Sequence, residues 1–280
     1  MNNAPQPLVS ICIPAYNAAA YIGETLRSAL AQSYQNIEII VCDNQSTDNT
    51  AEIVRQFNNP RITLHINEQN LGAAGNFIRS LSLVRGKYVK LLCADDLITP
   101  DCIEKQVRAF EEHPNDNIVM VTGAKIVIND KGKNLFVQKF PGKGVIDGKK
   151  AIAMSVRRGR NIFGEPGLPL MLTSAYRQIP EMIKDKDYVY CIDIDLWCKL
   201  LKLGNLVVVN EPLFKFRLAA TSLSSGIAWR QIRIVQKYFS RLRDDKSLGI
   251  TRATYCMGWI MAALMGAARN LTLMLFKCNK

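Results

Sequence analysis

The sequence predicts an α/β fold in which a mostly parallel sheet is flanked by helices. Short apolar runs alternate with helical patterns over the first part of the chain, at a spacing of about 25 residues, which is typical of repeated β-α units. The runs are nearly continuous in apolar residues, as expected for parallel strands buried on both faces. The chain has 280 residues, of which 48% are apolar, so it is long enough to cover such a sheet.

Four strands and three helices are expected in this first part. Pro14 ends the first strand, and Ile22, Leu26 and Leu30 share one face of the first helix. Ligands of such sheets bind at the carboxyl ends of the strands. We therefore expect the binding and catalytic residues just after each strand. The strands are expected at residues 8–13, 37–42, 61–66 and 88–93, and the helices at residues 21–30, 50–57 and 72–83.

The pattern is weaker beyond residue 98. The stretch 129–148 is rich in Gly, Lys and Asn and is expected to be an excursion or a loop. From residue 222 onward the alternation stops and the chain becomes basic and then apolar, which indicates a boundary. The other expected elements are helices at 100–112 and within 187–203, and strands at 118–121 and 206–209.

Charge and cysteine content narrow the class of protein. The net charge is +12, and the excess lies in the second half, because residues 1–140 carry 13 basic and 14 acidic side chains against 23 and 10 in residues 141–280. This half is expected to face phosphates or an anionic membrane. The eight cysteines include no C-x-x-C pair, so reduced thiols are expected rather than disulfides or a zinc site. The first residues do not resemble a secretory signal, and a cytoplasmic location is expected.

Residues suited to binding a nucleotide sugar follow the first three strands. Tyr16 offers an aromatic face to a base, and Asp43 can accept an N–H from the edge of a pyrimidine. Gly72 and its small neighbours let the backbone approach a ligand closely. The donor-binding candidates at these strand ends are Pro14, Tyr16, Asn17, Asp43, Asn70, Gly72 and Asn76.

Two adjacent carboxylates, Asp95 and Asp96, follow the fourth strand. Such charges at the end of an apolar strand are costly unless a cation joins them. A divalent cation that bridges two phosphates is the simplest partner, and we favour it over a solvated turn. Asp95 and Asp96 are therefore candidate metal ligands, and Asp95 is also a candidate donor-binding residue.

The order of these motifs resembles that of the family 2 glycosyltransferases, whose fold is called GT-A. The resemblance runs over about residues 7–217 and comprises P-A-Y-N, D-N-x-S-x-D-x-T, N-x-G and A-D-D. It continues with N-I-F-G-E-P at 161–166, D-I-D-L-W at 193–197 and Arg217. The chain is thus similar to inverting transferases that build bacterial surface polysaccharides.

The resemblance implies which residues bind the donor and its metal. Tyr16 and Asp43 would hold the base, and Arg217 is similar to an arginine that follows the last strand in many members. Asp95 and Asp96 match the D-x-D-type element that binds Mg²⁺ or Mn²⁺, with Asp96 as the more direct ligand.

The resemblance also implies the chemistry. These enzymes invert the anomeric centre in a single displacement, in which the metal stabilises the departing diphosphate and a carboxylate deprotonates the attacking hydroxyl. Asp193 falls where the family has this general base, and Asp195 is the alternative. This chain departs from the family pattern at Cys93, in place of the first Asp of the D-x-D-type run, and at Ile192, in place of the Glu before the base.

Together these features predict a glycosyltransferase. It would move a sugar from a nucleotide sugar, expected to be a UDP-sugar, to a lipid-linked oligosaccharide in the synthesis of O-antigen or capsule. Residues 1–97 are expected to form the nucleotide-sugar-binding half, 98–217 the acceptor-binding and catalytic half, and 218–280 a helical, membrane-associated tail.

The tail is a basic segment followed by an apolar one. Residues 218–280 carry 10 basic and 2 acidic side chains. A basic amphipathic helix within 229–252 and an apolar helix within 255–276 fit a position in the membrane interface, at the inner face of the cell membrane. A helix packed on the catalytic part is the main alternative. A transmembrane helix is less favoured, because it needs an uncharged run of about 20 residues.

Two other classes of protein fit the sequence less well. A dinucleotide-dependent oxidoreductase would have a G-x-G-x-x-G turn after the first strand, and the sequence has none there. A non-catalytic or nucleic-acid-binding basic protein with a Rossmann-like domain would leave the paired carboxylates unexplained. We therefore expect no nucleic acid among the partners.

Overall fold

The computed structural model describes residues 6–179, 190–218 and 230–278, with the backbone alone for 268–278. Within these ranges the chain forms a ten-stranded sheet in the order β3-β2-β1-β4-β9-β6-β10-β5, with β7 beside β6 and β8 beside β10. The strands are β1 (Val9–Ala15), β2 (Ile37–Asp43), β3 (Ile62–Ile66), β4 (Tyr88–Leu91), β5 (Leu97–Ile98), β6 (Ile118–Ile128), β7 (Asn134–Gln138), β8 (Gly144–Ile146), β9 (Leu170–Leu172) and β10 (Asn205–Arg217).

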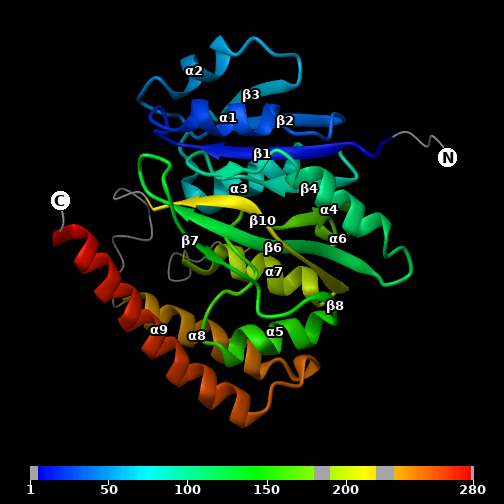
Figure 1. Cartoon of the computed structure of the whole chain (residues 1–280), viewed down its shortest axis with the longest axis vertical. Coiled ribbons are helices and arrows are strands. Elements are labelled where there is room, and N and C mark those ends of the chain that lie inside the picture. Colours follow the sequence, from blue (N-terminus) through cyan, green and yellow to red (C-terminus); the bar gives the residue numbers. More distant parts are fainter. Residues whose placement is uncertain (1–5, 180–189, 219–229, 279–280) are drawn as a thin grey trace.

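Helices cover both faces of this sheet (Figure 1). They are α1 (Ile22–Leu30), α2 (Thr50–Gln56), α3 (Gly72–Ser82), α4 (Cys102–Glu111), α5 (Gly148–Arg157), α6 (Thr173–Tyr176), α7 (Ile192–Leu201), α8 (Arg230–Asp244), the short 3-10 helix η3 (Lys246–Leu248) and α9 (Arg252–Cys278). Apolar side chains of α1, α2 and α4 form one core cluster against the sheet. Those of α3, α5, α7 and α8 form the other.

The β-α alternation of the first half follows the sequence prediction. β1 lies between β2 and β4 and pairs with both in parallel, and β3 extends the sheet beside β2, also in parallel. Both β1 and β2 are buried at every position, which explains their nearly continuous apolar runs. The predicted α/β fold, a mostly parallel sheet flanked by helices, is confirmed, and the carboxyl ends of these strands lie at one edge.

The second half contains more strands than the sequence indicated. The stretch 129–148, expected to be a loop, contains β7 and β8. β7 is exposed along most of its length. Because neither of its faces is buried, its sequence does not alternate between apolar and polar residues. The strand expected at 206–209 is the start of the longer β10, which continues past Pro212 through irregular pairing with β6. Proline lacks the N–H that a regular ladder needs. Residues 187–189 of the expected helix and the boundary at 222 lie outside the described residues.

The tail packs against the body of the protein. α8 buries Tyr238, Phe239 and Leu242 in the core cluster that α5 and α7 share. α9 touches α5 at backbone distance, because a β-carbon on Gly258 would lie only 1.9 Å from the carbonyl oxygen of Val156. Packing on the catalytic part, the alternative to a purely interfacial tail, is therefore what the structure shows for α8 and for one side of α9.

The other side of α9 is apolar and exposed. Met257, Trp259, Ile260 and Leu264 are 46%, 50%, 56% and 57% exposed. In Figure 1, α9 lies along the outside of the molecule, at the end opposite β3 and α2. Over the part of the chain that the structure describes, no helix combines the length and the apolar character that crossing a bilayer requires.

Candidate active site

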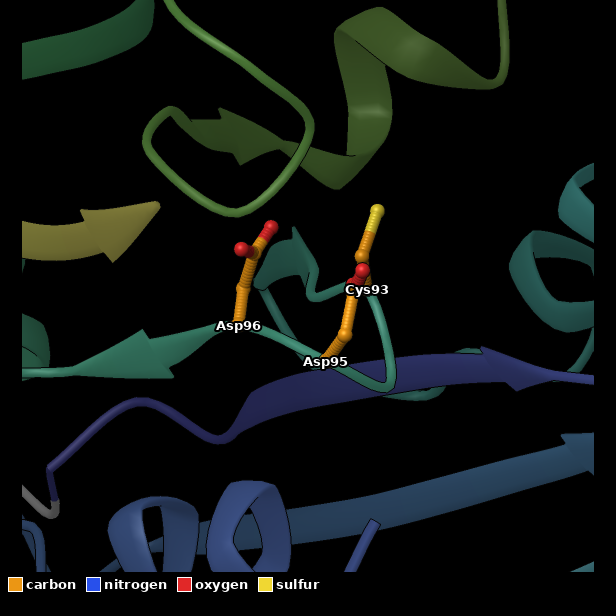
Figure 2. Close-up of side chains that lie close together, drawn as sticks. All are labelled: Cys93, Asp95 and Asp96. Carbon is orange, nitrogen blue, oxygen red and sulfur yellow. The ribbon is translucent and has the colours of Figure 1, made fainter. Parts of the chain in front are cut away.

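Cys93, Asp95 and Asp96 lie together on the short loop between β4 and β5 (Figure 2). Their side chains project to the same side of the loop, away from β1. The sulfur and one oxygen of each carboxylate all lie within 4.8 Å of one another. This spacing suits a shared cation, and the two carboxylates supply the oxygen ligands that Mg²⁺ and Mn²⁺ prefer.

Burial raises the free-energy cost of ionising both carboxyl groups of this pair. Burial, followed by the charge of the neighbouring Asp95, raises the pKa of Asp96 well above its ordinary value. Burial also raises the pKa of Asp95, and Arg217 opposes the rise. Two carboxylates that resist ionisation side by side are stabilised by a divalent cation, so these residues fit the metal that the sequence predicted.

Arg217, at the end of β10, holds the loop that carries the two carboxylates. It is 1% exposed, and its backbone N–H donates to Oδ1 of Asp96 at 2.9 Å. Each nitrogen of its guanidinium donates to a protein oxygen, and direct binding of Arg217 to the donor stays a prediction. The acceptors are the carbonyl oxygens of Asp95 (2.9 Å) and Asp130 (2.8 Å) and Oε2 of Glu24 (2.6 Å).

The loops after β1 and β2 are tied to each other. Oδ1 of Asn17 accepts from the backbone N–H of Thr47 at 2.8 Å, and the N–H of Asn17 donates to Oγ of Ser46 at 2.9 Å. The hydroxyl of Ser46 in turn donates to the buried carboxylate of Asp43. Tyr16 is 50% exposed, so its ring is free to meet a ligand. Pro14 precedes this loop within β1.

A network of asparagine amides joins the ends of β1, β2 and β3. Asn76 is 3% exposed and donates to the carbonyl oxygen of Cys42 at 3.0 Å. Asn67 donates to Asn76 and to Asn44, each at 2.9 Å, and Asn44 donates to Asn70 at 2.8 Å. Sequence reasoning missed Asn44 and Asn67, although both are amides directly after apolar strands. In this structure the side chains of Asn70 and Asn76 hold the strand ends, and their contact with the donor stays a prediction.

An open hollow lies beside this network. Gly72 begins α3 with a φ of +70°, a conformation that favours glycine, and nothing lies within 4 Å of the place of a β-carbon. The hollow is about 340 Å³ in volume and is lined by Ile66, Asn67, Glu68, Gln69, Leu71 and Arg79. It leaves room for a ligand group beside the strand ends that the sequence predicts to bind the donor.

Asp193 and Asp195, the two alternatives for the base, face different parts of the protein. Oδ2 of Asp193 accepts from the amide of Asn161 at 2.9 Å. Burial raises the pKa of Asp193 to about 6, and the charge of Glu165 adds to the rise. Asp195 faces the tail instead, where Tyr238 of α8 donates to it at 3.3 Å and Lys199 pairs with it at 2.8 Å. The geometry therefore favours Asp193 as the base.

Glu165 and Lys125 form an ion pair at the site that sequence reasoning did not assign. Lys125 lies on β6, and Glu165 lies in the segment 161–168. Besides its effect on Asp193, the charge of Glu165 contributes to the raised pKa of Asp96. The available signal was the motif N-I-F-G-E-P at 161–166, which resembles the family without indicating a role for its Glu.

The sequence matches known proteins over most of its length. A family model described as Glycosyl transferase family 2 matches residues 10–161. An uncharacterised glycosyltransferase of Haemophilus influenzae is 31% identical over 224 residues, which are 78% of this chain and 68% of that protein. The Escherichia coli enzyme WfgD, named UDP-Glc:alpha-D-GlcNAc-diphosphoundecaprenol beta-1,3-glucosyltransferase, is 27% identical over 92% of this chain and 94% of its own length.

Solved structures match the fold. TarS of S. aureus (residues 1–349) in complex with UDP-GlcNAc has a TM-score of 0.65 at 17% identity, over 92% of this chain and 79% of that one. The mannosyltransferase PcManGT of Pyrobaculum calidifontis, in complex with GDP-Man and Mn²⁺, has a TM-score of 0.63 at 16% identity, over 99% of this chain and 81% of that one. The chain spans 64% and 39% of the length of two further TarS structures.

Proposed function

The chain belongs to glycosyl transferase family 2, and we propose that it moves a sugar from a UDP-sugar to a lipid-linked saccharide in cell-surface polysaccharide synthesis, with inversion of the anomeric centre. The observation that carries this proposal is a paired-carboxylate loop, Asp95 and Asp96, with a separate half-buried carboxylate, Asp193, within electrostatic reach of the same loop at Cys93. The first suits the departing diphosphate and the second suits the attacking hydroxyl.

The donor is assigned to residues 1–97. Tyr16 stacks on the base and Asp43 accepts from its edge, while Asn70, Gly72 and Asn76 shape the loop that lines the remaining nucleotide. TarS binds UDP-GlcNAc and WfgD is named for UDP-Glc, which supports a UDP-sugar. PcManGT binds GDP-Man, so a GDP-sugar is the second donor to test.

Asp95 and Asp96 are proposed to hold Mg²⁺ or Mn²⁺. Their raised pKa values in a buried loop support this role, as does the Mn²⁺ bound by PcManGT. When bound, the cation neutralises charge on the diphosphate as it leaves. Arg217 keeps the loop in place through the hydrogen bond of its N–H to Asp96.

Asp193 is proposed to take the proton of the acceptor hydroxyl. The Asn161 amide donates to one of its oxygens at 2.9 Å and the N–H of Ile194 donates to the other at 2.8 Å. The carboxylate is therefore already oriented before the reaction begins. A pKa of about 6 leaves it ionised near neutral pH and a stronger base than an ordinary aspartate. Residues 98–217 thus supply the base and the acceptor side.

The acceptor and the tail point to a membrane surface. WfgD is named for a diphosphoundecaprenol-linked sugar, and a lipid-linked acceptor requires access to a bilayer. The exposed apolar side of α9 and the net positive charge of residues 218–280 support peripheral binding at the inner face of the cell membrane. Each Lys or Arg near an anionic leaflet contributes about 1 kcal/mol.

The test is a transfer assay with purified protein. UDP-glucose, UDP-galactose, UDP-GlcNAc, UDP-glucuronate and GDP-mannose are each offered with Mn²⁺ and a synthetic GlcNAc-diphosphate lipid. A glycosylated lipid of inverted anomeric configuration supports the proposal. A protein that binds none of these donors, with or without Mn²⁺, would overturn it.

A further inference from the structure

Among the described residues, none donates to one of the carboxylate oxygens of Glu165. One oxygen pairs with the ammonium of Lys125, whose side chain also lies 5.1 Å from the ring centroid of Phe216. The other, Oε2, is buried, and no donor within the described part of the chain reaches it. Leaving a buried charged acceptor without a hydrogen bond is costly, so this oxygen favours a donor from outside the protein, such as a ligand hydroxyl.

The segment that carries Glu165 is rigidly held on both sides. Before it, the carbonyl oxygen of Gly164 accepts from the indole N–H of Trp197 at 3.1 Å and from the Asn161 amide at 3.0 Å. After it, the buried ammonium of Lys90 donates to the carbonyl oxygens of Gly167 and Leu168, at 2.9 Å and 3.0 Å. A fixed carboxylate selects a ligand better than a mobile one, because no ordering cost is added on binding.

The same contacts place Glu165 next to the base. Asn161 donates with one amide nitrogen both to Asp193 and to the carbonyl oxygen of Gly164, the residue before Glu165. The charge of Glu165 also reaches Asp96. Glu165 therefore lies within electrostatic reach of both the proposed metal loop and the proposed base.

In a single displacement the transferred sugar lies between the metal-bound diphosphate and the base, and therefore between the proposed metal loop and Asp193. The anomeric carbon must lie in line between the leaving diphosphate and the attacking hydroxyl, so a side chain close to both ends of this line is close to the sugar ring. We infer that Glu165, held by Lys125, is a specificity-determining residue that accepts a hydrogen bond from a hydroxyl of the transferred sugar. The inference rests on the proposed function.

The charge around this position also selects the class of sugar. Among the described residues, Lys125 is already paired with Glu165 and Arg160 lies within reach of the same charge. The carboxylates Asp95, Asp96 and Asp193 add further negative charge. A uronic acid would bring a further carboxylate into this group, which like-charge repulsion disfavours. The preferred donor is a neutral sugar with a free hydroxyl where Glu165 reaches it.

The test compares the wild type with Glu165→Gln, which removes the charge but keeps the shape. The probes are UDP, UDP-glucose, UDP-galactose, UDP-GlcNAc, UDP-glucuronate and deoxy analogues of the best substrate. For the wild type, removing the recognised hydroxyl should lower kcat/KM by about 10- to 100-fold, the usual effect of losing a hydrogen bond to a charged group. For the variant, the parent and that deoxy analogue should differ by less than about threefold, and rejection of UDP-glucuronate should weaken.

Controls separate this role from a structural one. UDP affinity should be the same in both proteins, whereas the unfolding midpoint should fall in the variant because Lys125 loses its charged partner. Glu211→Gln, which breaks the surface pair with Lys105, should keep the wild-type preference for the parent donor. A variant that discriminates against the deoxy donors as strongly as the wild type overturns the inference, as does a loss confined to the KM of the acceptor. A wild type that binds no sugar nucleotide overturns the proposed function and this inference together.

Discussion

The backbone N–H of Arg217 donates a 2.9 Å hydrogen bond to Oδ1 of Asp96, across a separation of 121 residues. Through this bond the last strand of the sheet fixes the loop that carries the paired carboxylates. The guanidinium of Arg217 adds a second contact to the same loop, at the carbonyl oxygen of Asp95. The geometry of the proposed metal site thus depends on a residue that does not itself belong to the pair.

Arg217→Ala should destabilise the fold and loosen this loop. The guanidinium is buried and makes three hydrogen bonds to protein oxygens, so the expected loss is about 2–4 kcal/mol in the free energy of unfolding. Urea unfolding measures it. Arg108→Ala is the matched control, because Arg108 and its partner Glu112 are 63% and 62% exposed and a surface pair contributes about 0–1 kcal/mol. Equal losses in the two variants would contradict the structural role of Arg217.

Asp95→Asn and Asp96→Asn should each weaken Mn²⁺ binding in the presence of UDP by at least about tenfold, because each removes an anionic ligand. Asparagine is preferred to alanine at Asp96, because its carbonyl oxygen still accepts the N–H of Arg217. The free-Mn²⁺ signal in electron paramagnetic resonance gives the affinity directly. Asp101→Asn, at an acid that pairs with Lys105 on the surface, should bind Mn²⁺ like the wild type. Wild-type affinity in both site variants would refute the metal assignment.

Asp193→Asn should slow the chemical step and leave donor binding intact. Removing a general base typically lowers the rate by about 10²–10⁴-fold. Asp195→Asn is the matched comparison, because that carboxylate contacts Tyr238 and Lys199 rather than the site. It should lower stability more than kcat. If Asp195→Asn gave the larger loss of kcat, the two assignments would have to be exchanged.

Turnover should depend on pH through the ionisation of Asp193. Burial raises its pKa to about 6 and the base acts when deprotonated, so kcat should rise through pH 6 and level off above it. Because the charge of Glu165 contributes to this rise, Glu165→Gln should move the midpoint to lower pH. Rate profiles between about pH 4.5 and 8 would show the shift. An unmoved midpoint would mean that the two carboxylates do not interact.

The sequence predicts those parts of the fold and site that local pattern determines. β1 and β2 are buried throughout, so their apolar runs identify them, and Asp95 and Asp96 are recognisable because they directly follow such a run. Motif register favours Asp193 over Asp195 as the base, but the contact that distinguishes them, Tyr238 on the tail, is not visible in the sequence. Glu165 was missed for the same reason: its partner Lys125 lies 40 residues away, on β6. The exposed strand β7 has no buried face to impose a pattern.

The last prediction concerns the exposed side of α9. Deleting the tail would remove Tyr238 and Phe239 from the core, so membrane binding has to be tested by surface substitutions. Trp259→Ser, Ile260→Ser and Leu264→Ser change side chains that are 50%, 56% and 57% exposed. The triple variant should keep its unfolding midpoint and lose binding to anionic vesicles, since burying a large apolar side chain contributes about 1.5–3 kcal/mol.

The control for this experiment is Leu203→Ser, an exposed apolar residue beyond the end of α7. It should bind phosphatidylglycerol vesicles like the wild type in a flotation assay. High salt should weaken binding of the wild type, because the basic side chains of the tail contribute through screened charge. In the triple variant, transfer to a lipid-linked acceptor should fall more than transfer to a short soluble analogue, since only the former requires the bilayer. Undiminished flotation of the triple variant would mean that another surface of the protein meets the membrane.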